Sequence, residues 1–148
     1  MEESQIIELA NKKIIDFAES QNPKVWHQMT MDWNWDSEYN FLDWLINNPK
    51  TDRATILMIY WKSSPSHGFK NKILLEERYT NNFYNNQNIY FNPKDDEGDD
   101  WTEYNKDGAF EIPKIMFTLL EGEHIEYPNG YIEGIPEKLF YEIEELYE

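Results

Sequence analysis

The sequence predicts a mainly α-helical protein that carries one long acidic loop. Apolar residues recur at helical spacings in several segments, and proline, glycine and asparagine separate these segments. The stretch 93–108 has no such period and is rich in acidic side chains. A chain of 148 residues can bury a sizeable core, so we expect a single small domain, 1–148, of packed antiparallel helices.

Two helices are expected in the first thirty or so residues. From Ile6 to Ala18 the apolar residues follow a helical pattern, which ends near Asn22-Pro23. Pro23 suits the first position of a second, short helix that reaches about Met29, because its fixed φ is already helical and no N–H is needed there.

Residues 33–65 are expected to form a central pair of helices. The first helix shows the i, i+3, i+4 pattern, with Ser37 as a possible cap and Pro49 beyond its end. The second can be capped by Thr51 or Asp52 and ends before Pro65. A short connection predicts antiparallel neighbours, and the wide apolar arc of the second helix predicts that it is the most buried. The residues that form the two patterns are Phe41, Leu42, Trp44 and Leu45, then Ala54, Leu57, Met58 and Trp61.

The C-terminal half is less regular. A further helix is expected from Phe69 to about residue 85, and the segment 110–120 fits either a short helix or a strand. Pro128-Asn129-Gly130 predicts a short β-hairpin or tight turn near 124–133. A last helix should follow Pro136, with acidic residues on its outer face.

The chain is strongly acidic. It has 29 acidic and 13 basic side chains, a net charge of −16. Residues 1–92 carry 12 acids and 9 bases, whereas residues 93–148 carry 17 acids and 4 bases. Direct binding to nucleic acid or to an anionic membrane is therefore disfavoured, since both need a basic footprint. Two interpretations stay open: the acids serve solubility, or they form a docking face for a basic protein.

The acidic loop, residues 93–108, holds the first set of candidate partner-binding residues. An EF-hand alignment on Gly98 or Gly108 fails because the obligatory ligand positions are wrong, so no metal site is predicted. An aromatic ring among charges is typical of a binding hot spot with a polar rim, although the ring could equally pack back and fix the loop. The candidates are Trp101 with Asp95, Asp96, Asp99, Asp100 and Glu103.

Trp33 and Trp35 are the other candidates. The two rings flank Asn34 in an expected loop. They either fill the gap between helices, while Asn34 and Asp36 satisfy backbone donors, or are exposed anchors for a partner.

No reaction chemistry is evident. The chain has no cysteine and none of the common nucleophile, phosphate-loop or zinc-protease motifs, so no catalytic residue and no cofactor are predicted. Glu2 and Glu3 stand where a signal peptide would be basic, and no apolar run is long enough to span a membrane, which favours a cytoplasmic protein. If carboxylates act in catalysis, the first to inspect are Asp32, Asp36, Asp43 and Asp52, although the position of Asp52 predicts a helix cap.

Residues 33–61 resemble the signature of an uncharacterised bacterial domain family. The similarity lies in Trp33-Asn34-Trp35-Asp36, in Leu42, Trp44 and Ile46, and in the run from Pro49 to Trp61. The chain departs from the signature at Thr51, where a cysteine is expected, and at Ile56, where alanine is expected. The resemblance implies a small helical domain without an assigned activity, of a type found in toxin-immunity neighbourhoods.

These observations together predict a non-catalytic, protein-binding domain. In the sharper hypothesis it is an immunity-type inhibitor whose acidic face docks on a basic partner such as a toxin domain. The alternatives are a carboxylate- or metal-dependent hydrolase and a helical scaffold or adaptor module.

Overall fold

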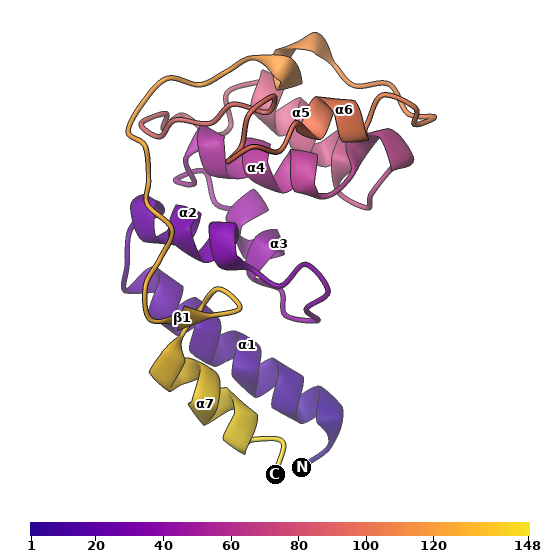
Figure 1. Cartoon of the computed structure of the whole chain (residues 1–148). Helices are drawn as coiled ribbons and strands as arrows, with labels where there is room; N and C mark the ends of the chain where they lie inside the picture. The colour runs from indigo at the N-terminus through magenta and orange to yellow at the C-terminus, as the bar shows by residue number, and fades with distance from the viewer. The chain divides into compact units, whose positions relative to one another are not determined.

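Helices dominate the structure, a computed structural model that describes all residues from 1 to 148 (Figure 1). The predicted mainly helical fold is confirmed. The chain forms two compact units: unit 1 consists of Met1–Asn47 and Glu126–Glu148, and unit 2 is Asn48–Ile125. Each unit is described by itself below.

Unit 1 contains four helices and a two-stranded hairpin. α1 buries one residue per turn of a single face, at the i, i+4 spacing that the sequence predicts. α2 begins where Asn22 Oδ1 accepts the Val25 N–H at 3.1 Å, with Pro23 in the first turn. The elements are α1 (Glu3–Glu19), α2 (Pro23–Asp32), α3 (Phe41–Ile46), β1 (Tyr131–Ile132), β2 (Ile135–Pro136) and α7 (Glu137–Glu145).

Aromatic side chains and the last helix complete the core of unit 1. Phe41 lies between Trp33 and Trp44, with ring centroids 4.9 and 6.0 Å away. Trp26 meets Trp44 edge to face and donates its indole N–H to the Ala18 carbonyl at 2.8 Å. α7 packs against α1 and the hairpin, so the two ends of the chain belong to the same unit (Figure 1).

The hairpin lies slightly later than its predicted position near 124–133. β1 and β2 pair antiparallel, with Ile132 opposite Ile135. The turn between them is formed by Glu133 (φ 52°) and Gly134 (φ 81°), the two positive φ values of a type I′ turn. Gly134 is required there, because an added Cβ would lie 2.5 Å from the Trp33 ring.

Unit 2 is built around α4 (Arg53–Lys62). Every residue from Ala54 to Trp61 is buried, in agreement with the wide apolar arc of this segment. α4 contacts η1 (Pro65–His67), α5 (Lys72–Thr80) and α6 (Trp101–Tyr104), and Trp61 donates its indole N–H to the carbonyl of Met116 in η2 (Lys114–Phe117) at 2.8 Å. Since α3 belongs to unit 1 and α4 to unit 2, the antiparallel packing of the predicted pair stays a prediction.

Two segments of unit 2 form less structure than the spacing predicts. α5 ends at Thr80, before the expected end near residue 85, and Asn82 has a positive φ of 60° just beyond it. The ambiguous segment 110–120 contains only the single 3-10 turn η2. Leu120 then exchanges backbone hydrogen bonds with Phe91 at 2.9 and 3.0 Å.

Candidate functional site

The negative charge is concentrated in unit 1. Its residues include 16 acidic and 4 basic side chains, a net charge of −12. Unit 2 contains the acidic loop but also 9 basic side chains against 13 acids, a net charge of −4. Most of the excess negative charge therefore belongs to unit 1, whereas the densest acidic stretch of the sequence belongs to unit 2.

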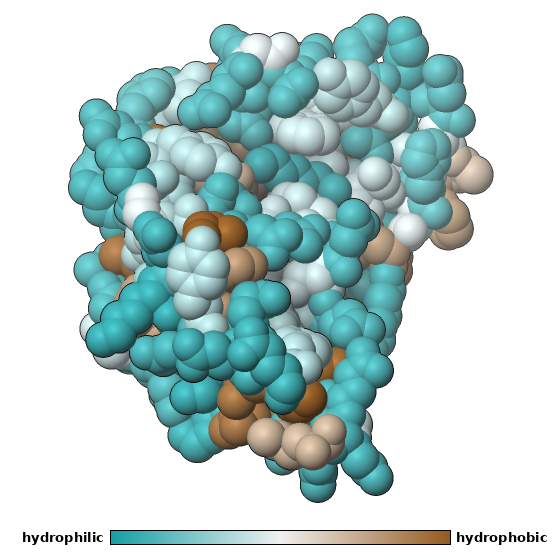
Figure 2. Space-filling model, turned by 60° about the horizontal axis from the view of Figure 1, so that its bottom comes forward, coloured by the Kyte–Doolittle hydropathy of each residue, from teal (hydrophilic) through white to brown (hydrophobic).

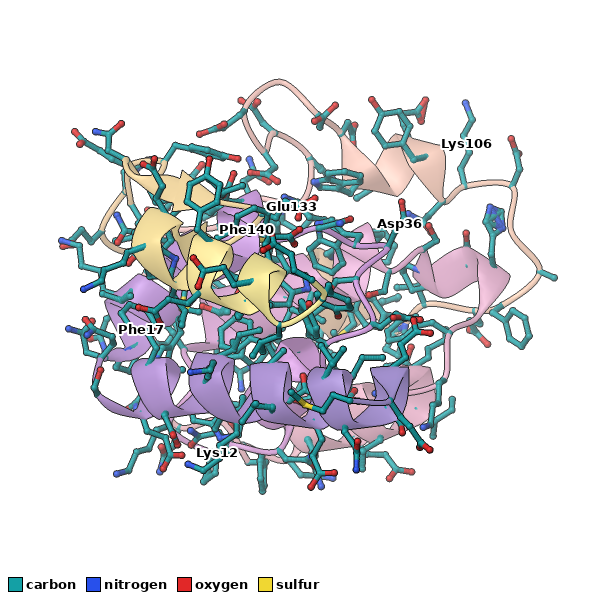
Figure 3. All side chains as sticks on the ribbon, turned by 90° about the horizontal axis from the view of Figure 1, so that it is seen from below. Lys12, Phe17, Asp36, Lys106, Glu133 and Phe140 are labelled. Atoms are coloured by element: carbon teal, nitrogen blue, oxygen red, sulfur yellow. The ribbon has the colours of Figure 1, made fainter.

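Unit 1 also contains a pocket of about 380 Å³, which we call the acidic pocket. It is formed by the loop 34–39, the hairpin and α7, and Ile135 and Ile143 at its base are almost fully buried. Figure 3 labels one residue from each of these three parts: Asp36, Glu133 and Phe140. The lining residues are Asn34, Asp36, Ser37, Glu38, Tyr39, Glu133, Ile135, Phe140, Ile143, Glu144 and Tyr147.

Short polar side chains determine the shape of the loop 34–39. Asn34 Oδ1 accepts the Asp36 N–H at 3.0 Å, and Ser37 Oγ accepts the Tyr39 N–H at 3.1 Å, so each side chain satisfies a donor two residues ahead. Ser37 thus stabilises the loop and does not cap α3, whose N-cap is Asn40. The Asn40 N–H in turn donates to Asn11 Oδ1 of α1 at 2.9 Å.

The hairpin turn is held against this loop. Asn34 Nδ2 donates to Glu133 Oε1 at 3.1 Å. Asp32, at the end of α2, accepts the Gly134 N–H at 2.8 Å and a hydrogen bond from the Tyr127 hydroxyl. These contacts position the Glu133 side chain at the pocket.

The acidic pocket has a negative electrostatic environment. Four carboxylates line it, from Asp36, Glu38, Glu133 and Glu144, and no lysine or arginine does. The Tyr39 and Tyr147 hydroxyls are hydrogen-bonded at 3.0 Å. The pKa of Tyr39 lies above its ordinary value, chiefly because of burial and this hydrogen bond, with further contributions from the charges of Glu144 and Glu38. Such a pocket favours a bound cation.

The predicted partner-binding acids of the acidic loop mostly stabilise the loop itself. Asp96 and Asp99 flank a tight turn at Glu97-Gly98, and their backbone groups bond at 2.9 and 3.0 Å. Asp100 caps α6 by accepting the Thr102 and Glu103 N–H groups. A hydrogen bond from the Thr102 hydroxyl is the main cause that lowers the pKa of Asp100, and the two backbone hydrogen bonds lower it further. Asp95 accepts the Gly98 N–H at 3.2 Å, and Glu103 pairs with Lys106 at 3.0 Å.

Trp101 lies partly buried among these acids. Its indole N–H donates to Asp96 Oδ2 at 3.0 Å, and its ring meets Tyr104 edge to face. The Lys62 ammonium of α4 lies 5.9 Å from the ring centroid. These contacts fit the alternative in which the ring packs back and fixes the loop.

Trp33 and Trp35 differ in exposure. Trp33 is 5% exposed, and its ring lies tilted against that of Phe41, with the ring centroids 4.9 Å apart. A buried ring is not available to a partner, so this position fits the alternative in which Trp33 fills the gap between helices. Trp35 is half-buried in the loop beside the acidic pocket but is not among its lining residues.

Of the four acids named for possible catalysis, three have identifiable and different roles. Asp52 caps α4, as predicted from its position, and is 1% exposed; Oδ1 accepts the Ala54 N–H at 2.9 Å and Oδ2 accepts the Asn88 N–H at 2.7 Å. Burial raises its pKa, against the effect of these hydrogen bonds. Asp32 holds the hairpin, and Asp36 lines the acidic pocket. Nowhere does the structure bring three His, Cys, Asp or Glu side chains into an arrangement that could hold a metal ion.

The sequence did not identify Tyr39, Glu133, Phe140, Glu144 and Tyr147 as site residues. Glu144 is part of the outer acidic face that the sequence predicts for the last helix. No sequence pattern near Glu144 indicates that this face lies next to residues 34–39. The signal that could have helped is Glu133-Gly134, since a Glu-Gly pair between Ile132 and Ile135 fits a two-residue hairpin turn.

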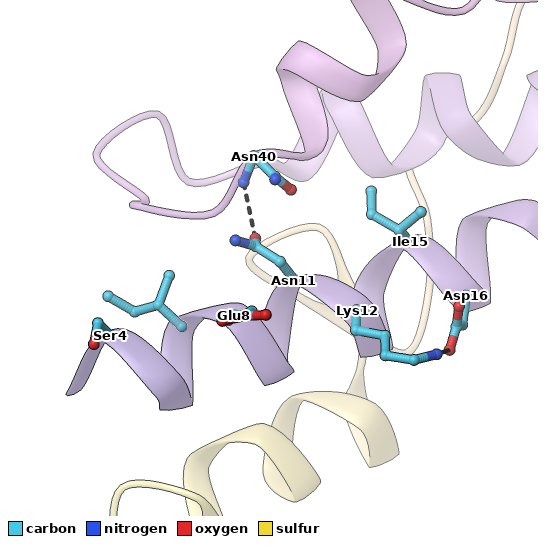
Figure 4. A pocket seen from close by; sticks show the side chains of 8 residues that line it. Ser4, Glu8, Asn11, Lys12, Ile15, Asp16 and Asn40 are labelled. Atoms are coloured by element: carbon cyan, nitrogen blue, oxygen red, sulfur yellow. Dashed lines mark hydrogen bonds and ion pairs between the residues drawn. The ribbon is translucent and has the colours of Figure 1, made fainter. Parts of the chain in front are cut away.

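A second pocket of about 470 Å³ lies along α1, and Asn40 also lines it (Figure 4). Its charged residues are mixed in sign: Lys12 pairs with Asp16 at 2.6 Å, and Glu8 lies one turn earlier. In the view of Figure 2 most of the surface is hydrophilic, and hydrophobic side chains appear in small separate groups. The acidic pocket is thus the more distinctive feature of unit 1.

A family model matches part of the chain. Residues 21–78 match a domain of unknown function (DUF4274). The matched segment runs from the start of α2 nearly to the end of α5, so it includes the loop 34–39 and the region of the resemblance noted above. No curated protein and no solved structure matches the chain. None of the helices is long and apolar enough to cross a membrane.

Proposed function

We propose that the chain is a non-catalytic protein-binding domain that docks on a basic protein through unit 1. The charge of unit 1, −12, is the observation that carries this proposal. Such a field accelerates association with a positively charged partner and disfavours acidic ones. We assign the docking face to unit 1 and not to the acidic loop, because the carboxylates of that loop mostly accept hydrogen bonds within its own turns and helix cap.

In the narrower form of this proposal the partner is a toxin domain and the chain is an immunity-type inhibitor. The resemblance of residues 33–61 supports this form, and the charge suits a partner whose own surface binds nucleic acid. Electrostatic steering would supply a fast on-rate, and contacts with partly buried rings would slow dissociation.

The test is affinity capture from the native cells with two charge-matched variants. The unit 1 variant is Glu137→Lys, Glu142→Lys, Glu145→Lys, and the control in unit 2 is Glu77→Lys, Asp107→Lys, Glu121→Lys; all six carboxylates are exposed. We expect one basic protein to be recovered by the wild type and the control, more weakly at higher salt. Loss of at least ten-fold in affinity is expected only for the unit 1 variant. Equal recovery by both variants, or an acidic partner, contradicts the proposal.

A further inference from the structure

We propose that the acidic pocket of unit 1 receives one arginine side chain of the partner. This inference rests on the proposed function for the existence of that partner, and it adds the chemical group that is recognised and the residues that recognise it.

The size and lining of the pocket suit a single long side chain. A volume of about 380 Å³ is at the small end of the range of ligand pockets, roughly 300–1,000 Å³. The rings of Tyr39, Phe140 and Tyr147 line the pocket and are partly exposed, so a methylene stem can lie against them and a cation can stack on them.

The arrangement of the carboxylates indicates an extended cation. They come from three separate parts of unit 1, and they do not converge in the way that a metal ion requires. A guanidinium spreads its charge over a plane with five N–H donors, so it can reach carboxylates on different sides while one face stacks on a ring. An ammonium is a compact and strongly hydrated point charge, which uses such a pocket less well.

The carboxylates of the acidic pocket are available. The side chains of Asp36, Glu38 and Glu144 form no ion pair, and Glu133 accepts one hydrogen bond, from Asn34, on Oε1 alone. In the acidic loop, by contrast, Asp96, Asp99 and Asp100 already accept hydrogen bonds from side chains. Free carboxylates and ring surfaces therefore coincide in unit 1, at this pocket.

The experiment is an NMR titration of the full chain with three small probes. They are N-acetyl-arginine methylamide, the lysine analogue, and the citrulline analogue, which has the shape of arginine without its charge. We expect the arginine probe to shift resonances of residues 34–39 and 133–147, with an affinity at least five-fold above that of either other probe. The variant Glu38→Gln, Glu144→Gln should lose at least five-fold in this affinity, whereas the matched control Glu77→Gln, Glu121→Gln should bind like the wild type.

Each outcome decides one question. Equal binding of citrulline and arginine, a preference for lysine, shifts elsewhere in the chain, or no shifts at all would overturn the inference. A captured basic partner whose affinity is unchanged by Glu38→Gln, Glu144→Gln also overturns it but leaves the proposed function intact. Selective binding of the arginine probe without any basic partner would instead reject the proposed function.

Discussion

The Lys72 ammonium lies 2.7 Å from Glu76 Oε2, and the two residues are only 5% and 8% exposed. Glu76 also accepts a hydrogen bond from the Tyr60 hydroxyl at 2.5 Å, and Lys72 donates to the Glu111 carbonyl at 2.8 Å. The ion pair thus joins α4, α5 and the segment before η2 within unit 2. Burial and the neighbouring carboxylate both raise the pKa of Tyr60.

Lys72→Met should lower the free energy of unfolding by about 3–5 kcal/mol, because it leaves the Glu76 carboxylate buried without a counter-ion. Lys72→Met, Glu76→Gln should recover most of this loss, since glutamine keeps an acceptor for Tyr60 and carries no charge. Urea denaturation monitored by tryptophan fluorescence measures both. A single variant as stable as the wild type would show that the pair is not buried in solution.

Asp52→Ala should cost about 2–3 kcal/mol of unfolding free energy. The substitution removes the cap of α4 and leaves the Asn88 N–H without its acceptor, two effects of about 1 kcal/mol or more each. Asp107→Ala is a suitable control, because that carboxylate is exposed. Thermal unfolding of the two variants would contradict the assignment if both lost the same stability.

Asp52 should also make stability depend on pH. Its pKa is raised in the folded state from the ordinary value of 3.8, so the folded chain holds the proton more tightly than the unfolded chain does. The protonated carboxyl therefore contributes stability below pH 3.8 that is lost as the pH rises through the folded pKa. The Asp52→Asn variant lacks this loss, so the difference in unfolding free energy by which it falls below the wild type should narrow between pH 4 and pH 7. A deficit that widens over this range would reverse the sign of the shift.

Asn105→Ala should detach the acidic loop from η1. Asn105 is 6% exposed, and its Oδ1 accepts both the Ser66 N–H at 3.1 Å and the Ser66 hydroxyl at 2.8 Å. Two buried donors lose their acceptor in the variant, at a cost of about 1–3 kcal/mol. Faster amide hydrogen exchange at residue 66 and across 101–110 would be the local signature, and unchanged exchange there would contradict it.

Glu97→Asn should stabilise the chain by about 0.5–1 kcal/mol. Glu97 occupies the first central position of its turn with φ 52°, a region that asparagine adopts at lower cost than glutamate. The side chain is exposed, so no contact is lost. A lower melting temperature for this variant than for the wild type would exclude the positive φ.

The local elements of the fold could be predicted because their determinants are adjacent in sequence. The Asp52 cap, the apolar arc of 54–61 and the breaker Pro65 together define α4 without reference to the rest of the chain. The same holds for Asn22 and Pro23 at the start of α2. The predicted position of the hairpin was too early because two turn signals lie close together. Glu133-Gly134, and not Asn129-Gly130, forms the turn between the paired strands.

The acidic pocket could not be predicted, because its residues are brought together from 34–39 and 133–147 only by the return of the chain to unit 1. The sequence also assigned the excess negative charge to the wrong part of the molecule, for the same reason. A count along the sequence groups the acidic loop with α7. In the fold the loop belongs to unit 2, which has nine basic residues, and α7 belongs to unit 1, which has four. Sequence proximity is a poor guide to which charges share a surface.

Unit 1 is assembled from two stretches that are separated by the whole of unit 2. On the ribosome, at roughly 5–20 residues per second, unit 2 is complete before any residue of α7 has been made. The face of α1 that α7 covers therefore stays uncovered in the nascent chain until translation has passed Glu145. Slow translation of the last segment would prolong this interval, in which the half-formed unit is open to chaperones and proteases.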